Sequence, residues 1–282
     1  MDVKFEGENV VRHMDLTTHN HGSNSNTAPW TYADRMSFAE GLSACDGERK
    51  RATADDACGK DLNKKPPCPD NSKIKDAEAA RQKAKDAAGK KYKRDPEYLK
   101  QNALAKKEYG NLAQSINNDK CHSALRCFLT PYSANHCCPG QTPDHLIDAA
   151  SFGPRDSNTK IEGWSKYSTD AAPCICAEGP NQTTATHGQL HTRRGVVARR
   201  ERNRKGQWSR ARATHVGAKA AKKTFPASQC SQECLEAQLN KYHDKVKDDG
   251  KEKPIQAKSS MTRDESERSK ATTEMFDSAS TE

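Results

Sequence analysis

The stretch Thr184-Ala-Thr-His-Gly-Gln-Leu-His191 places two histidines four residues apart, directly after threonines that can cap a helix. Gly195 is a typical helix end, so we expect a helix from about Thr184 to Gly195. On that helix His187 and His191 point the same way, about one turn apart. Two imidazoles in this arrangement can ligate one metal ion, although the spacing alone also arises by chance in many proteins.

Upstream, an aspartate and a histidine are adjacent in the run Pro143-Asp-His-Leu-Ile147. The proline leads into a short extended piece, His145-Leu-Ile147, and a second extended piece that would pair with it is predicted from Ala171 to Ala177. Gly179-Pro180 then predicts the turn that leads into the helix. The sequence therefore predicts two paired strands, a turn and a helix, with His145 on the first strand and Asp144 directly before it.

These segments together carry the side chains that hydrolysis of a nucleic-acid backbone needs. A carboxylate and two imidazoles, from Asp144, His187 and His191, can ligate one divalent ion such as Mg²⁺, Mn²⁺ or Zn²⁺. A neutral imidazole at His145 can accept a proton from water near pH 7, and Asn181 can hold that group in place. We therefore predict His145 and Asn181 as catalytic residues beside a single metal ion.

Positive charge is concentrated directly after the predicted helix. The chain has 282 residues and a formal net charge of +9, and residues 193–223 hold twelve lysines or arginines against one acid, Glu201. Such a block is often solvated surface, but beside a metal site it can also bind phosphates with little sequence preference. The predicted nucleic-acid-binding residues are Arg193, Arg194, Arg199, Arg200, Arg202, Arg204 and Lys205.

Eleven cysteines are many for a chain of this size, and the odd number leaves at least one outside any intramolecular pair. Zinc sites usually show two Cys-x-x-Cys knuckles, which this chain lacks, so we favour disulfides or mixed thiols over zinc. The sequence does not give their connectivity. The cysteines expected to staple a small core around the two strands are Cys121, Cys127, Cys137, Cys138, Cys174 and Cys176.

Composition divides the chain into four segments. With 33% hydrophobic residues and a mean hydropathy of -1.07, the chain cannot fill one core over its whole length. Residues 1–30 form a polar connector, and 31–116 contain a cysteine-bearing loop segment followed by helices at about 75–92 and 96–116. Residues 117–247 hold the strands, the basic block and a closing helix, and 248–282 form a disordered tail. The predicted fold class is α+β and mostly helical.

No apolar stretch reaches the length of a membrane helix, and the first residues lack the apolar core of a signal peptide. We therefore expect no membrane partner. If the protein leaves its cell, another machine has to move it.

The span from about Cys137 to Arg194 resembles the GHH-signature toxins of the HNH and endonuclease VII superfamily. The resemblance rests on Pro143-Asp-His-Leu-Ile, Asp170-Ala-Ala-Pro-Cys-Ile-Cys, Asn181 and Thr186-His-Gly-Gln-Leu-His. It implies a small ββα-metal core with flanking helices. It also implies His145 as general base, Asn181 orienting it or ligating the metal, and Asp144, His187 and His191 as metal ligands.

The N-terminal run from Val3 to His21 is similar to the end of the PAAR-like domain that precedes such toxins in type VI secretion effectors. The resemblance then implies the toxin half of an effector, which hydrolyses DNA in the cytoplasm of competitor bacteria. Its partners would be the DNA substrate, the secretion spike and a cognate immunity protein in the producing cell.

One residue departs from the signature, which would have His-His where this chain has Asp144-His145. In endonuclease VII-like sites an Asp-His pair is workable, because the carboxylate binds metal and the histidine acts as base. Alternatively, Asp144 replaces a needed imidazole and the activity is weakened or lost.

Two other functions fit parts of the sequence. Pro173-Cys-Ile-Cys176 is similar to the Pro-Cys-x-x-Cys of zinc-dependent nucleic-acid deaminases, but it is one residue short and no His-x-Glu accompanies it. A cysteine-stapled basic module that binds nucleic acid without catalysis is the second alternative.

Overall fold

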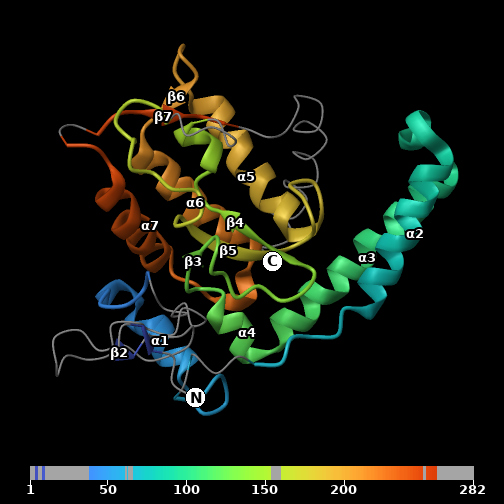
Figure 1. Ribbon diagram of the computed structural model, residues 1–282, viewed down its shortest axis with the longest axis horizontal. Coiled ribbons are helices and arrows are strands. Elements are labelled where there is room, and N and C mark those ends of the chain that lie inside the picture. The colour runs from blue at the N-terminus through green and yellow to red at the C-terminus, as the bar shows by residue number, and fades with distance from the viewer. Residues whose placement is uncertain are drawn as a thin grey trace, which may run out of the picture.

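The computed structural model describes residues 4–5, 8–9, 38–60, 62, 66–153, 160–249 and 252–258. The fold is α+β and mostly helical, which confirms the predicted class. Helices surround a small antiparallel sheet, and a long helical hairpin extends from one side of this body (Figure 1). Two short strands, β1 (Lys4–Phe5) and β2 (Glu8–Asn9), pair with each other. The remainder of the predicted connector, residues 1–30, lies outside the described residues.

The central sheet has three strands in the order β3-β5-β4, namely β3 (Thr130–Pro131), β4 (Gln141–His145) and β5 (Pro173–Glu178). The second predicted strand does pair with the chain at His145, which lies opposite Cys174. The first strand was expected over His145–Ile147 but is Gln141–His145, so it ends where the predicted strand begins. Pro143 is tolerated inside β4 because this strand lies at the sheet edge. The two-residue strand β3 was not predicted.

The predicted helix is α5 (Ala185–Glu201), which follows β5 through a short turn. It was expected to end near Gly195 but continues to Glu201, so the first part of the basic block is helical. Gly195 is buried inside the helix instead of ending it. Leu190 of α5 is fully buried in the main core cluster with Leu146 and Ile175, next to the strands that carry the candidate site.

Two further helices cover the core, α6 (Arg210–Thr224) and α7 (Gln232–Val246). The side chain of Ser231 accepts a hydrogen bond from the Cys234 amide and caps α7. Leu235 and Leu239 are completely buried, so the prediction of a closing helix is confirmed. α6 passes very close to the chain after β4, because a Cβ on Gly217 would lie 2.3 Å from the carbonyl oxygen of Leu146.

Part of the expected tail is folded. β7 (Ile255–Gln256) pairs with β6 (Gln207–Trp208), and Ile255 is fully buried in a second core cluster. Ordered packing therefore continues beyond residue 248, where the disordered tail was expected to begin. One apolar residue in a polar stretch gives too weak a sequence signal to predict this. Residues 259–282 of that tail lie outside the described residues.

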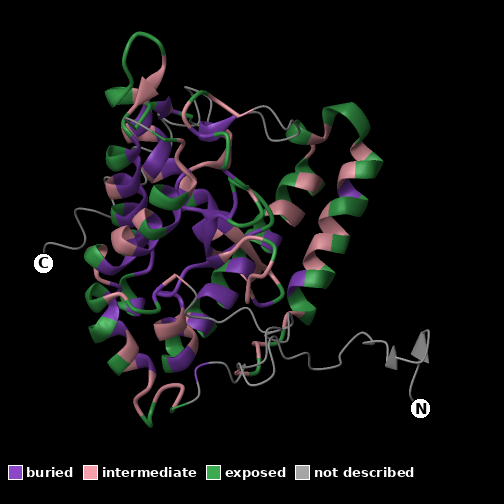
Figure 2. Ribbon diagram, turned by 60° about the vertical axis from the view of Figure 1, so that its left-hand side comes forward, coloured by how far each residue is buried: buried purple, intermediate pink, exposed green. Residues whose placement is uncertain are grey.

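The helical hairpin consists of α2 (Ser72–Ala88), the 3-10 turn η2 (Gly89–Arg94) and α3 (Pro96–Asn118). Asp95 caps α3 by accepting a hydrogen bond from the Tyr98 amide, as the Asp-Pro pair predicts. Burial is concentrated near the base of the hairpin, and its far end is exposed (Figure 2). Both predicted helices are confirmed, with the last turn of the first one tightened into a 3-10 helix.

The smaller helical elements lie around this body. They are η1 (Ser43–Cys45), α1 (Asp46–Ala52), α4 (Lys120–Leu125), η3 (Ala149–Phe152) and η4 (Pro226–Ser228). None of the described helices is both long and apolar enough to cross a bilayer.

Five disulfides join distant parts of the described chain. They are Cys45–Cys234, Cys58–Cys121, Cys68–Cys138, Cys127–Cys230 and Cys137–Cys176. Cys174 belongs to none of them, which corrects its expected role as a staple. It lies on the central strand β5, where its thiol is buried and faces the carbonyl oxygen of Ala172 at 3.5 Å.

Candidate metal centre and active-site cavity

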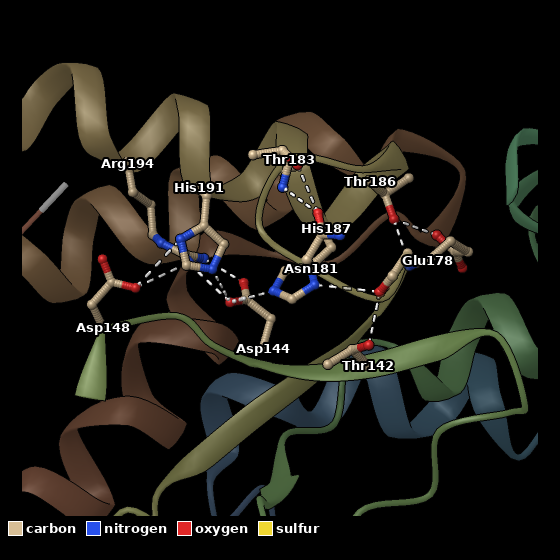
Figure 3. A network of polar contacts seen from close by, with 12 residues as sticks. Thr142, Asp144, Asp148, Glu178, Asn181, Thr183, Thr186, His187, His191 and Arg194 are labelled. Carbon is tan, nitrogen blue, oxygen red and sulfur yellow. Dashed lines mark hydrogen bonds and ion pairs between the residues drawn. The ribbon is translucent and has the colours of Figure 1, made fainter. Parts of the chain in front are cut away.

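Asp144 lies at the centre of the candidate site, near the end of β4, and only 3% of it is exposed. Its Oδ1 is 2.9 Å from His191 Nε2 and 3.5 Å from His187 Nε2. Both histidines project from the first half of α5 toward this carboxylate (Figure 3). The ligand atoms of the three residues all lie within 4.8 Å of one another. The structure thus brings together the three predicted metal ligands.

Each imidazole has an acceptor on its other side. Nδ1 of His187 lies 3.4 Å from the carbonyl oxygen of Gly179, and Nδ1 of His191 lies 3.6 Å from Asp148 Oδ1. With a cation bound, an acceptor at Nδ1 would keep the ring proton there and would leave the lone pair of Nε2 for the ion; in its absence the Nε2 atoms face Asp144 Oδ1. One carboxylate and two such imidazoles form a donor set that fits a divalent cation.

Arg194 completes the surroundings of Asp144. Its Nη1 donates to Asp144 Oδ2 at 2.6 Å and its Nη2 donates to Oδ1 at 3.0 Å. Arg194 is buried, with 5% exposed, and its Nη2 also lies 3.6 Å from Asp148. This corrects its expected role in binding phosphates, because the guanidinium is directed at Asp144 inside the protein. The available sequence signal was its position three residues after His191, on the same face of the helix.

Electrostatics keeps Asp144 ionised. Burial alone would raise the pKa of this carboxyl, but the charge of Arg194, followed by that of His191 and hydrogen bonds from both histidines, holds the pKa well below its ordinary value. Burial likewise works against the charged form of Arg194, and the Asp144 carboxylate outweighs it and raises the pKa of the guanidinium. The site therefore presents a permanent carboxylate to any bound cation.

His145, the predicted base, is held from two sides. Its Nε2 lies 2.9 Å from the carbonyl oxygen of Thr169, and its ring stacks on Tyr132 with centroids 5.0 Å apart. Because a carbonyl only accepts, this contact places the proton on Nε2 and makes Nδ1 the basic nitrogen. Neither Tyr132 nor Thr169 was predicted from sequence, since neither belongs to a recognisable pattern.

All five predicted site residues line one cavity of about 460 Å³. The cavity is also lined by Lys258, from the segment after β7, which adds an exposed ammonium group. Sequence reasoning missed Lys258 because it placed this segment in a disordered tail. The predicted residues lining the cavity are Asp144, His145, Asn181, His187 and His191.

Asn181 shapes the turn between β5 and α5. Its Oδ1 accepts hydrogen bonds from the Thr183 amide at 3.0 Å, the Thr183 hydroxyl at 2.7 Å and the Thr184 hydroxyl at 3.0 Å. The same turn needs Gly179, whose φ is +117° and whose added Cβ would lie 2.4 Å from the carbonyl oxygen of Thr184. The side-chain oxygen of Asn181 is thus used within the turn that brings His187 to the site.

The basic block divides into surface cations and structural ones. Arg210 is buried and its Nη2 contacts Asp244 at 2.7 Å and Glu252 at 2.6 Å, and Arg212 pairs with Glu201 at 2.6 Å. Arg193 and Arg199 are half-buried. The exposed cations among the predicted DNA contacts, at the end of α5 and in the following loop, are Arg200, Arg202, Arg204 and Lys205.

Residues 141–243, from β4 into α7, match a family model. Its description is GHH signature containing HNH/Endo VII superfamily nuclease toxin 2. The match begins at the strand that carries Asp144 and His145 and includes both α5 histidines. This part of the chain is therefore similar to nuclease toxins of that superfamily, as its residues predict.

The chain is also 38% identical over 259 residues to the DNase toxin Tse7 of Pseudomonas aeruginosa. The aligned region covers 86% of this chain and 61% of that relative, so the chain spans about three fifths of the relative's length. No solved structure matches the chain.

Proposed function

We propose that this chain is a metal-dependent endonuclease toxin that hydrolyses DNA. The observation that supports this most strongly is the convergence of Asp144 Oδ1, His187 Nε2 and His191 Nε2 at a cavity that His145 also lines. The similarity of residues 141–243 to nuclease toxins and the name of the relative point to the same chemistry. We propose DNA and not RNA as the substrate because the relative is named a DNase toxin.

The residues have distinct tasks in this proposal. Asp144, His187 and His191 hold the divalent ion, which when bound supplies positive charge beside the scissile phosphate and the leaving 3′ oxygen. His145 removes a proton from the attacking water at Nδ1, and the Thr169 carbonyl stabilises the resulting imidazolium through Nε2. Arg194 is a positioning residue, because it orients the carboxylate of Asp144 and does not itself reach the reacting atoms.

DNA binding is assigned to the exposed cations near the end of α5 and to Lys258 at the cavity. Their partners are phosphates, so we propose cleavage with little sequence preference. Asn181 is assigned to the turn that places His187, with a contribution to catalysis through that placement.

The structure argues against a deaminase. Cys176 is bonded to Cys137, so it is not a ligand beside Cys174. The non-catalytic binding module remains as the alternative that the experiment below separates.

We further propose that the toxin is delivered by type VI secretion and acts in the cytoplasm of the target cell. A cognate immunity protein would protect the producer, and an acidic face on it would suit Lys258 at the cavity and the exposed cations near the end of α5. Pull-down of the purified chain with the product of an adjacent open reading frame tests whether this partner binds. Adding the same product to a plasmid-cleavage assay tests whether it inhibits: we expect cleavage to be lost, and unchanged cleavage would contradict the proposed immunity function.

The nuclease itself is tested by incubating the chain with supercoiled plasmid DNA and Mg²⁺, Mn²⁺ or Zn²⁺, with and without EDTA. We expect metal-dependent nicking that His145→Ala abolishes. His215→Ala is the matched control, because His215 is a half-exposed histidine on α6, paired with Glu236 at 3.1 Å and not among the residues that line the cavity. A salt-sensitive gel shift without strand breaks under every metal condition would instead indicate a binding module.

A further inference from the structure

A second group of metal-ligating side chains is built from Cys68, His122 and Cys138. Their ligand atoms also lie within 4.8 Å of one another. None of the three lines the cavity of the candidate active site. Cys68 precedes α2, His122 lies on α4 and Cys138 precedes β4, so the group joins three separate parts of the chain. In the structure the two sulfur atoms form a disulfide.

His122 is oriented in the manner of a metal ligand. Its Nδ1 lies 3.0 Å from Asp119 Oδ1, and its Nε2 lies 3.6 Å from Cys138 Sγ. The side chain of His122 is only 10% exposed. A carboxylate on one ring nitrogen and a ligand position at the other is the usual outer shell of a zinc-bound histidine.

Asp119 is itself fixed by the start of α4. Its carboxylate accepts a hydrogen bond from the His122 amide at 2.7 Å and caps the helix. The same carboxylate lies 3.0 Å from Nδ1 of the His122 ring, at ion-pair distance but without hydrogen-bond geometry. This arrangement is present before any ion binds, so no loop has to rearrange to orient the imidazole.

The distance between nitrogen and sulfur fits a tetrahedral zinc site. Bond lengths of about 2.3 Å for Zn–S and about 2.0–2.1 Å for Zn–N place the two ligand atoms about 3.6 Å apart. Cys138 Sγ and His122 Nε2 are separated by 3.6 Å. The two sulfur atoms need to move apart to about 3.8 Å, which reduction of the bond between them permits. Cys68 Sγ lies within 4.8 Å of His122 Nε2 and has to come to about 3.6 Å from it.

We propose that the Cys68–Cys138 disulfide, once reduced, becomes a zinc site formed by the two thiolates and His122. A dithiol reductant donates two electrons and two protons to the disulfide and is itself oxidised to a disulfide. The zinc ion then displaces the two thiol protons, and a water molecule takes the fourth position. This proposal does not depend on the nuclease activity.

A zinc ion bound by Cys68, His122 and Cys138 would cross-link the same parts of the chain as the disulfide does. Cys138 lies among Ile74, Tyr109, Leu112 and Ile116 at the base of the helical hairpin, and its carbonyl accepts a hydrogen bond from the Gln141 amide at the start of β4. Zinc would therefore tie the hairpin to the strand that carries Asp144 in a reducing compartment, where disulfides rarely persist. In an oxidising compartment the disulfide makes the same connection.

The test is zinc-dependent protection of cysteines in the full chain. The protein is reduced with a phosphine, incubated with or without zinc, alkylated briefly with iodoacetamide and analysed residue by residue by mass spectrometry. We expect zinc to protect Cys68 and Cys138 selectively, and His122→Ala to remove that protection. His215→Ala should keep it.

Asp119→Asn gives a sharper comparison, because asparagine still caps α4 but removes the carboxylate from His122. We expect its zinc affinity, measured by competition with a chromophoric chelator, to fall about 10–100-fold. Equal alkylation of Cys68 and Cys138 with and without zinc would overturn the proposal. Protection that survives His122→Ala, or a reduced chain that stays unfolded with zinc present, would overturn it as well.

Discussion

The Asp144–Arg194 pair determines what the candidate metal centre can do. A buried carboxylate and a buried guanidinium joined by two hydrogen bonds are together neutral, so the two histidines and the bound ion do not face an uncompensated anion. This interpretation gives Asp144 a workable role where the resembled signature has histidine. It also predicts that Arg194 contributes to the stability of the fold as well as to metal binding.

Replacing Arg194 with leucine should therefore be costly. We expect the free energy of unfolding to fall by about 3–5 kcal/mol, because a buried carboxylate loses its partner. Arg194→Lys keeps the charge but not the paired hydrogen bonds, and should recover part of the loss. Urea unfolding in EDTA measures both. An Asp144→His/Arg194→Leu variant should lose less stability than the sum of the single changes, and strict additivity would contradict the coupling.

His243 predicts a loss of stability in mild acid. It is buried among the rings of Phe152, Trp164 and Tyr167, and its Nδ1 lies 2.7 Å from the Leu239 carbonyl oxygen. Burial lowers its pKa to about 3. The folded protein then binds this proton less readily than the unfolded chain, so the stabilising effect is complete above the unfolded pKa of about 6.5 and declines below it.

Between pH 6.5 and pH 4.5 we expect a decline of about 1.4 kcal/mol per pH unit from this residue. Urea midpoints at several pH values measure it. His243→Phe should flatten the slope over that range. Equal slopes in wild type and His243→Phe would show that His243 is not the source.

At the scale of elements, the helical spacing of residues predicted the site better than the local content of charged residues did. The spacing of His187 and His191 predicted their common face on α5, and the structure places both Nε2 atoms at one carboxylate. Arg194 lies on that face too. Its charge led to the prediction that it binds nucleic acid with the rest of the basic block, so its position beside His191 on the helix was not used. Partners of His145 such as Tyr132 and Thr169 depend on tertiary packing, which no local pattern encodes.

The turn between β5 and α5 tests how far element placement controls the site. Gly179→Ala should shift the first turn of α5, because the new Cβ would collide with the Thr184 carbonyl at 2.4 Å. We expect a loss of about 1–3 kcal/mol from backbone strain together with weaker metal binding. Gly41→Ala is the control, since Gly41 also has a positive φ, +71°, but no atom lies within 4 Å of its Cβ position. Weaker metal binding in both variants would contradict a local effect.

At the scale of the whole molecule, long-range connections were the part that sequence could not supply. Cysteine number indicated staples, but the pairing of Cys45 with Cys234, 189 residues apart, has no local signal. The return of the chain through β7 to pair with β6 likewise depends on only two buried side chains in a polar stretch, Ile255 and Ala257. Both connections form only when distant segments pack together.

Charge distribution over the molecule predicts the salt dependence of DNA binding. Changing Arg200, Arg202 and Arg204 together to glutamine should weaken binding and reduce the slope of log K against log salt by about 0.9 for each phosphate that is no longer neutralised. Fluorescence anisotropy with the His145→Ala chain in EDTA measures binding without cleavage. The matched control changes Lys90, Lys91 and Lys93, which are all exposed in η2 of the helical hairpin, to glutamine and should leave the slope unchanged.

The proposed nuclease chemistry depends most on a cation bound between β4 and α5. Anomalous diffraction from crystals soaked with Mn²⁺ tests it most directly. We predict one strong peak within bonding distance of Asp144 Oδ1, His187 Nε2 and His191 Nε2. A map at saturating Mn²⁺ with no peak among these three atoms, and with Asp144 still bound only by Arg194 and the histidines, would contradict a metal-dependent mechanism.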